Sequence, residues 1–464
     1  MVFHKIEKIH FVGIGGIGMS GIAEVLLNLG FTATGSDIRK TDTTERLEQL
    51  GAKILYGHNK ENVQDADVVV ISSAVKPDNP EIQRAKEIFI PVIQRAEMLA
   101  ELMRMKYSIA VAGSHGKTTT TSIVSTILGH AGMDPTCVIG GKLNSLGSNA
   151  KLGDSKFLVA EADESDGTFL LLFPTIAVVT NIDLEHLDFY KDINEIKAAF
   201  LTFLNKVPFY GLDIICIDNA NIQSLIPHLK RRYMTYGLSK QADLRAEGIA
   251  YDGSRTTFRV VYKGYELGMI NLALPGVHNV VNALAACGVG IELDIPFAKI
   301  TEALKTFSGI QRRLEIKWDG DIKIIDDYGH HPTEIKATLA AVRKMCRGRI
   351  VVAFQPHRYT RTKALLEEFI TSFNEADLLI VTEIYAASEE KIEGITGMLL
   401  SEKIRASGHK NVLFVPTKED AAEKIIELAR SGDVVVSLGA GDINKICERL
   451  KAEWSKSKKV KGKK

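Results

Sequence analysis

The feature that most constrains the fold is residues 107–118, where an apolar run passes into a glycine loop ending in lysine and threonine. The run Tyr107–Ala112 predicts a buried strand, and Thr119–Ser125 predicts a helix after the loop. A strand, a glycine loop and a helix in this order are typical of a parallel sheet covered by helices. The sequence therefore predicts an α/β fold.

Short β-branched runs alternate with helical stretches, and this alternation starts three times, near Ile9, near Tyr107 and after Ile310. Three starts in 464 residues predict three domains, with boundaries near residues 103 and 310. The first and third domains, 1–103 and 311–464, are expected to be Rossmann-like. The middle domain, 104–310, is expected to hold a parallel sheet and a small antiparallel sheet, because polar and apolar residues alternate from about 240 to 275.

Composition excludes several classes of protein. Hydrophobic residues make up 45% and charged residues 25%, and the formal net charge is +1, so no nucleic-acid partner is expected. We find neither a run long enough to span a membrane nor a signal segment before the first strand. Five scattered cysteines without metal-ligand spacing suggest reduced thiols, and hence a cytoplasmic protein. The basic tail, Ser455–Lys464, is expected to be a solvated end.

The first glycine loop, Gly13–Gly18, follows a predicted strand and opens a predicted helix. Gly15, Gly16 and Gly18 would let the backbone approach a diphosphate at the helix N-terminus. Asp37 ends the next predicted strand, where an acidic residue often binds a ribose hydroxyl. The loop does not choose between NAD and another nucleotide diphosphate. The plain alternative is a turn whose glycines serve packing only.

The second loop, Gly113–Thr118, carries the strongest local signal. Its backbone N–H groups can cradle phosphate oxygens, Lys117 can reach the β- and γ-phosphates, and the Thr118 hydroxyl can bind Mg²⁺. The first glycine lies three residues before Gly116 instead of the usual five. A simple lysine-containing turn is the alternative, but the preceding strand favours a phosphate loop.

Acidic residues follow two further predicted strands of the middle domain. Glu161–Glu164 follows Phe157–Ala160, and Thr180–His186 follows the apolar run that starts at Ile176. Because the carboxyl ends of strands line the active crevice of an open α/β sheet, these residues are expected near the phosphate loop. Carboxylates there would suit a Mg²⁺–nucleotide complex. Each run alone would more often be a solvated acidic loop.

Two polar segments of the third domain each follow a buried strand. Asp326–Pro332 and Gln355–Arg361 should lie at the same edge of the third sheet. Arg358 and Arg361 are three residues apart and would share a face if a helix begins there, where guanidinium groups suit a carboxylate or an acyl phosphate. The alternative is surface salt bridging. His330 is interpreted as hydrogen-bonding to substrate, because no matching third metal ligand is evident.

Eight motifs resemble those of the Mur ligases of bacterial cell-wall synthesis, over nearly the whole chain. They are Gly13–Gly21, Gly113–Thr120, Glu161–Ser165, Asn181–His186, His278–Ala286, Gln311–Arg313, Asp326–Pro332 and Gln355–Arg361. The shortened phosphate loop is itself the form that this family uses. The resemblance implies a UDP-substrate-binding Rossmann-like domain, a central ATP-binding ligase domain and a C-terminal Rossmann-like domain.

The resemblance also implies roles for single residues, which we state as expectations. The catalytic residues would be Lys117, Glu161, His186, His330, Arg358 and Arg361, of which Glu161 and His186, with Thr118, would bind metal. The ATP site would comprise Gly113, Ser114, His115, Gly116, Lys117, Thr118, Thr119, Asn279 and Asn282. The UDP-substrate would contact Gly15, Gly16, Ile17, Gly18, Asp37, Ser73, Arg312 and Arg313.

Within the family, the chain is most similar to the alanine-adding members. They lack the carbamylated lysine of later members, and Phe200 is judged to fill that position here. The implied partners are UDP-N-acetylmuramate, L-alanine and ATP, and alanine is joined to the lactyl carboxylate through an acyl phosphate. The implied cofactor is Mg²⁺, two ions for which Mn²⁺ can substitute, in a monomer or homodimer.

Four alternatives remain from the sequence. A relative that reattaches recycled tripeptide shares the layout, but its arginine segment differs from Gln355–Arg361. An NAD-dependent dehydrogenase would use the first glycine loop without needing Lys117 or Thr118. A nucleotide-hydrolysing switch or motor would not need Arg358 and Arg361 beside a second nucleotide fold. A non-catalytic nucleotide-binding module would not need the acidic strand ends.

Overall fold

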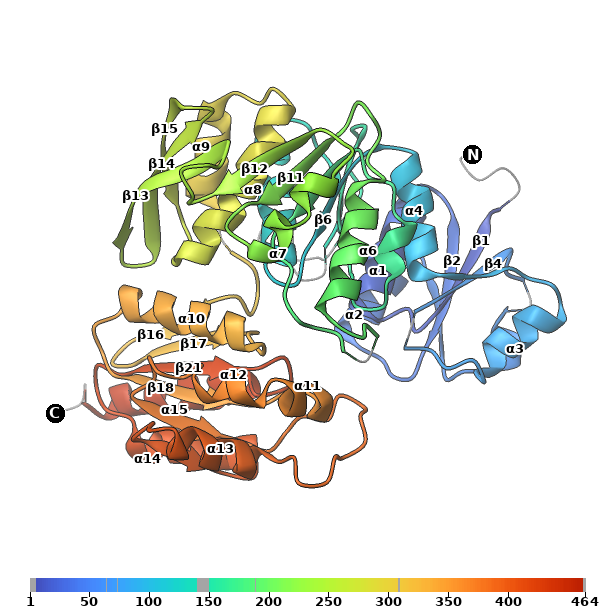
Figure 1. The fold of residues 1–464 in the computed structure, drawn as a ribbon. Helices are drawn as coiled ribbons and strands as arrows, with labels where there is room; N and C mark the ends of the chain where they lie inside the picture. The colour runs from blue at the N-terminus through green and yellow to red at the C-terminus, as the bar shows by residue number, and fades with distance from the viewer. Residues whose placement is uncertain are drawn as a thin grey trace. The chain divides into compact units, whose positions relative to one another are not determined.

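The structure is a computed structural model that describes residues 6–461, except residues 64, 73, 140–149, 188 and 308. Its strands form three sheets, of five, ten and six strands, which helices flank (Figure 1). The chain divides into two compact units. The second unit contains residues from Gly309 onward together with Gly248–Phe258 and Asn271–Val280, and the first contains the rest.

The first sheet has the strand order β3-β2-β1-β4-β5, and all its strands run parallel. The strands are β1 Lys8–Val12, β2 Thr32–Asp37, β3 Lys53–Tyr56, β4 Val68–Ile71 and β5 Val92–Gln94. The helices between them are α1 Ile17–Asn28, α2 Asp42–Gln49, η1 Lys60–Val63, α3 Pro80–Glu87 and α4 Arg95–Arg104. Helix α4 begins directly after β5, and α1 begins after the loop 13–16 that follows β1, so the N-termini of both helices lie at the carboxyl edge of this sheet.

The ten-stranded sheet has the order β15-β14-β13-β12-β11-β10-β6-β9-β7-β8. Its strands are β6 Tyr107–Ala112, β7 Thr136–Val138, β8 Ala150–Lys151, β9 Phe157–Glu161, β10 Ile176–Val179, β11 Leu212–Cys216, β12 Tyr233–Gly237, β13 Leu244–Asp252, β14 Arg255–Tyr262 and β15 Tyr265–Leu272. Its helices are α5 Lys117–His130, η2 Thr168–Leu171, α6 Ile193–Leu204, α7 Ala220–Gln223, η3 Ile226–His228, α8 Val277–Glu292 and α9 Phe297–Thr306. Strand β6 lies between β9 and β10 and runs parallel to both, which places the phosphate loop beside the acidic strand ends.

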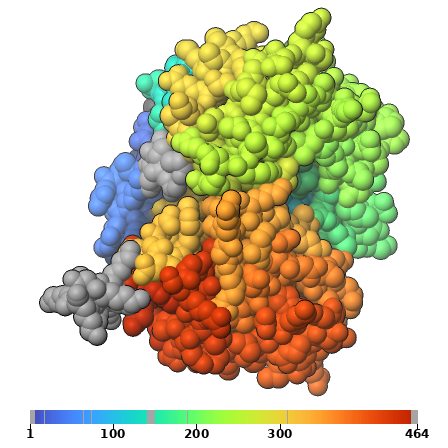
Figure 2. Space-filling model, turned by 90° about the vertical axis from the view of Figure 1, so that its left-hand side faces the viewer, coloured from blue at the N-terminus to red at the C-terminus, as the bar shows by residue number. Residues whose placement is uncertain are grey.

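The alternating segment forms strands β13, β14 and β15, which are joined by two-residue connections. Since two residues can link only antiparallel neighbours, these strands are hairpins, as the alternation predicted. They continue the ten-stranded sheet. Tyr265 and Met269 are exposed on β15, and the region contributes the yellow-green surface in Figure 2.

The third sheet has the order β16-β17-β21-β18-β19-β20, with only β16 pairing antiparallel. The strands are β16 Glu315–Asp319, β17 Lys323–Asp327, β18 Ile350–Phe354, β19 Leu378–Val381, β20 Val412–Phe414 and β21 Val434–Leu438. The helices are α10 Pro332–Met345, α11 Tyr359–Ala364, α12 Leu366–Ile370, α13 Gly397–Ala406, α14 Lys418–Leu428 and α15 Lys445–Lys461. Neighbouring residues such as Ile324 and Ile325 enter two different apolar cores, because a strand buries alternate side chains on opposite faces.

Two general expectations can be checked here. In the described part of the chain, no helix combines the length and the apolar character that crossing a membrane requires. All five cysteines are described, and each is a free thiol.

Candidate active site

The phosphate loop is fixed by contacts with the end of β10. Asn181 accepts a hydrogen bond from the His115 N–H through Oδ1, at 2.8 Å, and from the Ser114 N–H through its carbonyl, at 3.0 Å. The Thr180 hydroxyl donates to the His115 carbonyl at 2.6 Å. Gly113 has a φ of 130°, and a Cβ there would lie 2.1 Å from Thr180 Oγ1. The loop therefore requires glycine at this position.

Lys117, the first residue of α5, points into a cluster of acidic groups. Its ammonium donates to Glu164 Oε1 at 2.8 Å and to the Gly113 carbonyl at 2.6 Å. Burial lowers the pKa of Lys117, but the charges of Glu164, Asp163 and Glu161 outweigh burial and raise that pKa above its ordinary value. The lysine therefore keeps its positive charge over the whole neutral range, as charge neutralisation of phosphates demands.

Glu164 is the central carboxylate of this cluster. Its Oε1 lies 3.4 Å from His186 Nε2. Burial raises the pKa of Glu164, but the charge of Lys117 and the hydrogen bond with His186 lower it below its ordinary value. Glu164 Oε2 is buried and has no hydrogen-bond partner among the described residues. One oxygen is thus engaged by Lys117, and the other can still accept a cation or a donor.

Glu164, Glu185 and His186 each place one ligand atom within 4.8 Å of the others. Carboxylate oxygens are ligands that Mg²⁺ prefers, and the uncommitted Glu164 oxygen gives such an ion a coordination position. Next to them the Thr118 hydroxyl donates to the Glu161 carboxylate, at 3.0 and 3.2 Å from its two oxygens. These oxygen-rich groups fit the Mg²⁺ ions that ATP chemistry requires.

The other predicted ATP residues have different surroundings. His115 Nε2 lies 3.3 Å from Asp183 Oδ2. A Cβ on Gly116 would lie 2.5 Å from Asn282 Oδ1, so this amide lies directly against the loop. Thr119 is buried in α5. The buried Asn279 belongs to the second unit, and its amide donates to the Pro275 carbonyl at 2.7 Å.

Phe200, expected at the position of the modified lysine, is fully buried in α6. Its ring centroid lies 5.3 Å from that of Phe169. The residue therefore serves the core of the first unit and offers no metal ligand.

The first glycine loop is supported by Asp37. Its Oδ2 accepts from the Gly15 N–H at 2.9 Å, and its Oδ1 accepts from the Ile38 N–H at 2.8 Å. A side chain on Gly18 would meet the Arg95 guanidinium, since a Cβ there would lie 2.6 Å from Nη1. Gly16 is the N-cap residue of α1. The predicted contacts of Ser73 and of the Ile17 side chain lie outside the described residues.

The two polar segments of the third domain meet at one edge of the sheet, as predicted. Strands β17 and β18 both run parallel to β21, and Asp327, Leu438 and Phe354 are in register. The rings of His330 and His357, from the segments after these strands, lie 5.7 Å apart. The His357 ring stacks on Tyr385 at 5.6 Å, a contact that the sequence did not predict.

Arg361 and Arg358 take different positions beside these rings. Arg361 Nη1 donates to the His357 carbonyl at 3.2 Å. The helix begins only at Tyr359, and Arg358 is its N-cap residue, with a φ of 71°. The two arginines therefore do not share a helix face in the way that their spacing suggested. Arg358 Nη1 lies 4.0 Å from Glu389 Oε1 instead.

Arg312 and Arg313 both bind groups of their own unit. Arg312 donates to the Gly439 carbonyl at 2.6 Å and to Asp326 Oδ2 at 3.2 Å, and Arg313 donates to Glu334 Oε1 at 3.2 Å. Both guanidinium groups lie over the Tyr328 ring, at 5.0 and 5.3 Å. Their expected contact with the UDP-substrate stays a prediction.

The histidines at this edge should make stability depend on pH. Burial, together with the positive charges of Arg361 and Arg358, lowers the pKa of His357 from 6.5 to about 4. Because the unfolded chain then takes up a proton first, the stability contribution is complete above pH 6.5 and is lost as pH falls toward 4. We expect the urea midpoint of His357→Gln to fall less between pH 7.5 and pH 5 than that of the parent. Equal falls in both proteins would contradict this assignment.

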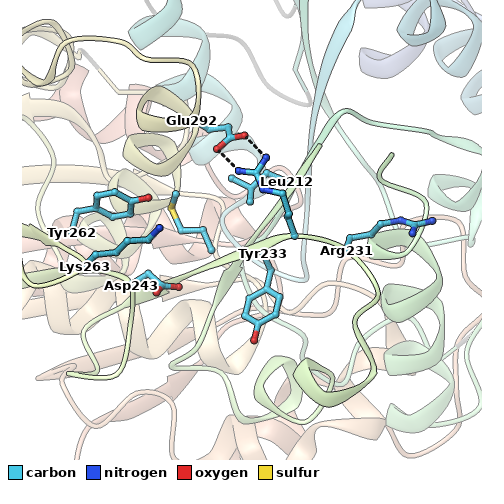
Figure 3. A pocket seen from close by; sticks show the side chains of 9 residues that line it. Leu212, Arg231, Tyr233, Asp243, Tyr262, Lys263 and Glu292 are labelled. Atoms are coloured by element: carbon cyan, nitrogen blue, oxygen red, sulfur yellow. Dashed lines mark hydrogen bonds and ion pairs between the residues drawn. The ribbon is translucent and has the colours of Figure 1, made fainter. Parts of the chain in front are cut away.

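A pocket of about 290 Å³ lies elsewhere in the first unit (Figure 3). It is lined by Leu212, Arg231, Arg232, Tyr233, Met234, Asp243, Tyr262, Lys263 and Glu292. Leu212 and Tyr233 are the first residues of β11 and β12, which run parallel to β10 and β6, so the pocket lies at the amino ends of these strands. The phosphate loop follows the carboxyl end of β6, and none of the lining residues belongs to the predicted site.

Comparisons with known proteins show which family this chain is similar to. Three family models match in order: "Mur ligase family, catalytic domain" at residues 8–107, "Mur ligase middle domain" at 111–290, and "Mur ligase, glutamate ligase domain" at 312–441. A UDP-N-acetylmuramate–L-alanine ligase from Geotalea uraniireducens is 60% identical, over 97% of this chain and 98% of the relative. One from Trichlorobacter lovleyi is 58% identical, over 97% and 99%.

Solved structures show the same fold. A UDP-N-acetylmuramate-alanine ligase from Thermotoga maritima superposes with a TM-score of 0.82 at 31% identity, covering 97% of this chain and 99% of that one. A murein peptide ligase from Psychrobacter arcticus has a TM-score of 0.71 at 26% identity, covering 96% and 98%. With three matching models in order and relatives this similar along their whole length, the chain belongs to the Mur ligase family.

Proposed function

We propose that this chain joins L-alanine to the lactyl carboxylate of UDP-N-acetylmuramate and converts ATP to ADP and phosphate, in the synthesis of peptidoglycan precursors. The observation that carries this proposal is the 60% identity, over nearly the whole of both chains, to a relative that bears this name. The buried cluster of Lys117, Glu164 and His186 supports the ATP-dependent part.

The chemistry requires activation of the acid. The oxygen that would have to leave from a carboxylate is a poor leaving group, so an amine does not displace it at a useful rate. A carboxylate oxygen of the substrate attacks the γ-phosphorus of ATP, the bond to ADP breaks, and an acyl phosphate forms. The free amine of alanine then attacks the acyl carbon, and phosphate departs with the carboxylate oxygen. The proton that the amine loses in this step passes to a base.

The residues of the phosphate loop supply the electrostatics of the first step. The Lys117 side chain would place its positive charge beside the β- and γ-phosphates, and the N–H groups of the loop would bind phosphate oxygens. Thr118 and Glu161 would hold one Mg²⁺, and Glu164, Glu185 and His186 would hold a second; Mn²⁺ can replace either. When bound, these ions neutralise the charge that shifts between the phosphates.

The edge of the third sheet would hold the amino acid and the reacting carboxylate. Arg361 and Arg358 bring guanidinium groups that suit carboxylates. Burial lowers the pKa of His330 well below its usual value and that of His357 to about 4, so both rings are neutral at pH 7 and are weak bases. They would accept or donate hydrogen bonds to substrate without removing the amine's proton.

The direct test is a coupled assay of ADP release. Purified protein is mixed with ATP, Mg²⁺ and UDP-N-acetylmuramate, and L-alanine, L-serine, glycine or the recycled tripeptide is added in turn. We expect ADP release that needs both the nucleotide sugar and an amino acid, with L-alanine giving the highest kcat/KM. Preference for the tripeptide would instead make this chain a recycling ligase. Reduced-cofactor absorbance after addition of NAD⁺, without release of ADP, would indicate a dehydrogenase.

A further inference from the structure

Arg95 lies between the two glycine-loop regions of the first unit. It is the first residue of α4 and directly follows β5. On one side its guanidinium contacts Gly18, in the first turn of α1, where a Cβ would lie 2.6 Å from Nη1 and 3.2 Å from Cζ. On the other side Nη2 lies 3.6 Å from Asp163 Oδ2. One side chain thus contacts both nucleotide-binding regions.

Asp163 connects Arg95 with the phosphate loop electrostatically. It precedes Glu164, which accepts from Lys117 at 2.8 Å. Burial raises the pKa of Asp163, but the positive charges of Lys117 and Arg95 lower it below its ordinary value. Asp163 is therefore ionised, and Arg95 and Lys117 stabilise the same negative charge. Charges of alternating sign therefore run from Arg95, beside Gly18, through Asp163 to Lys117.

The contact between Arg95 and Asp163 is a loose one. Charge-assisted hydrogen bonds between nitrogen and oxygen are about 2.7–2.9 Å long, whereas this separation is 3.6 Å, with exposed fractions of 23% for Arg95 and 42% for Asp163. The guanidinium can therefore turn toward a stronger anion without breaking a buried, well-formed pair. A diphosphate at the N-terminus of α1 would be such an anion, next to Gly18.

We propose that Arg95 is a positioning residue that couples the occupancy of the two nucleotide sites. This inference rests on the proposed function, because it takes the first loop as the site of the UDP part. When the diphosphate binds, Arg95 turns toward it and Asp163 loses a compensating positive charge. The acidic cluster beside the phosphate loop thereby has one more uncompensated negative charge, and this charge strengthens its attraction for the Mg²⁺ ion that ATP brings with it. By thermodynamic reciprocity, bound ATP tightens the binding of the UDP-substrate by the same factor.

Two substitutions should remove this coupling while shifting ATP affinity in opposite directions. In Arg95→Ala, Asp163 lacks the positive charge of Arg95 permanently. In the absence of UDP-substrate, a non-hydrolysable ATP analogue with Mg²⁺ should therefore bind this variant more tightly than it binds the parent. In Asp163→Asn, the charge itself is missing and the same analogue should bind more weakly. In both variants UDP-N-acetylmuramate should no longer change the affinity for the analogue. Arg95→Lys should retain part of the effect.

The experiment is titration calorimetry of the full chain with this analogue, with and without saturating UDP-N-acetylmuramate. The parent should show a ratio of the two dissociation constants of about five-fold or more, a typical size for coupling between sites. The ratio should be close to one in Arg95→Ala and Asp163→Asn. Arg104→Ala is the matched control, because Arg104 lies on the same helix and pairs only with the half-exposed Glu101 among its carboxylate neighbours in the described chain. It should keep the parental ratio.

The outcomes separate this inference from the proposed function. A merely structural role for Arg95 would weaken binding of both ligands and leave the ratio unchanged, which would overturn the proposal. A ratio of one between the two dissociation constants of the parent would also overturn the proposal. In that case ADP release in the coupled assay would still support the proposed function. Failure of the parent to bind UDP-N-acetylmuramate would overturn the proposed function as well.

Discussion

Replacing Lys117 with alanine should abolish ligation, with kcat lower by about 1,000-fold or more, while the affinity for UDP-N-acetylmuramate changes little. One preorganised group that stabilises transition-state charge is typically worth about 100- to 1,000-fold in kcat, and Lys117 would act on the transferred phosphoryl itself. The UDP-substrate is proposed to bind at the first loop, which does not include this lysine. ADP release and calorimetric binding of UDP-N-acetylmuramate measure the two effects separately.

A second variant controls for damage to the fold. Removing Lys117 leaves Glu164 as a buried carboxylate without its main countercharge, and breaking a buried pair from one side typically costs about 3–5 kcal/mol. The double variant Lys117→Ala, Glu164→Gln removes both charges and should recover most of the lost stability without recovering any ligation. Recovery of activity together with stability would show that Lys117 has only a structural role.

Replacing Gly113 with alanine should remove nucleotide binding almost completely. Residues with a side chain rarely adopt the φ of 130° that Gly113 has. The new Cβ would also lie 2.1 Å from Thr180 Oγ1 and 3.0 Å from two backbone atoms of residues 180 and 181. Backbone atoms cannot move away as a flexible side chain can, so the loop must shift and its N–H groups lose their alignment. We expect affinity for ADP to fall by about 100-fold or more, equivalent to roughly 3 kcal/mol.

Gly132→Ala is the matched control for Gly113→Ala. Gly132 follows the end of α5, the helix that the phosphate loop opens, and also has a positive φ, of 80°. A Cβ at this position meets nothing within 4 Å. This variant should therefore lose some stability through backbone strain and bind ADP normally. Similar losses of ADP affinity in both variants would mean that strain in the first unit, and not the shape of the loop, controls binding.

Sequence patterns predicted the long buried strands well. The predicted run Tyr107–Ala112 is strand β6 with the same bounds, because a strand that is buried on both faces shows as a continuous apolar run. The short strands β7, β8 and β20 were not predicted. They have two or three residues each, too few for a periodic pattern, and they exist because a neighbouring strand supplies hydrogen-bond partners.

The site was predictable where neighbouring residues define it. The loop from Gly113 to Thr118 is recognisable because its chemistry lies in consecutive residues. Glu164 was not singled out, although its acidic stretch was, since no periodicity shows which of four turn residues points at Lys117, 47 positions away in the chain. Arg95 carried no signal at all, because its importance depends on contacts with Gly18 and Asp163.

The edge of the third sheet shows the same limit. The spacing of Arg358 and Arg361 suggested a shared helix face, but Arg358 adopts a left-handed conformation and lies outside the helix. A residue other than glycine rarely adopts that conformation, so a local pattern does not predict it. The stacking of His357 on Tyr385 likewise depends on the parallel bridge between these two residues, which follow different strands.

The transfer of labelled oxygen tests most directly the central claim, which is that ATP phosphorylates the carboxylate of the substrate. UDP-N-acetylmuramate labelled with ¹⁸O in its carboxylate is incubated with the protein, ATP, Mg²⁺ and L-alanine, and the released phosphate is analysed by ³¹P NMR. Since the acyl phosphate forms through a carboxylate oxygen, each phosphate should carry one ¹⁸O atom. Unlabelled phosphate, released in step with ligation, would contradict phosphorylation of the carboxylate.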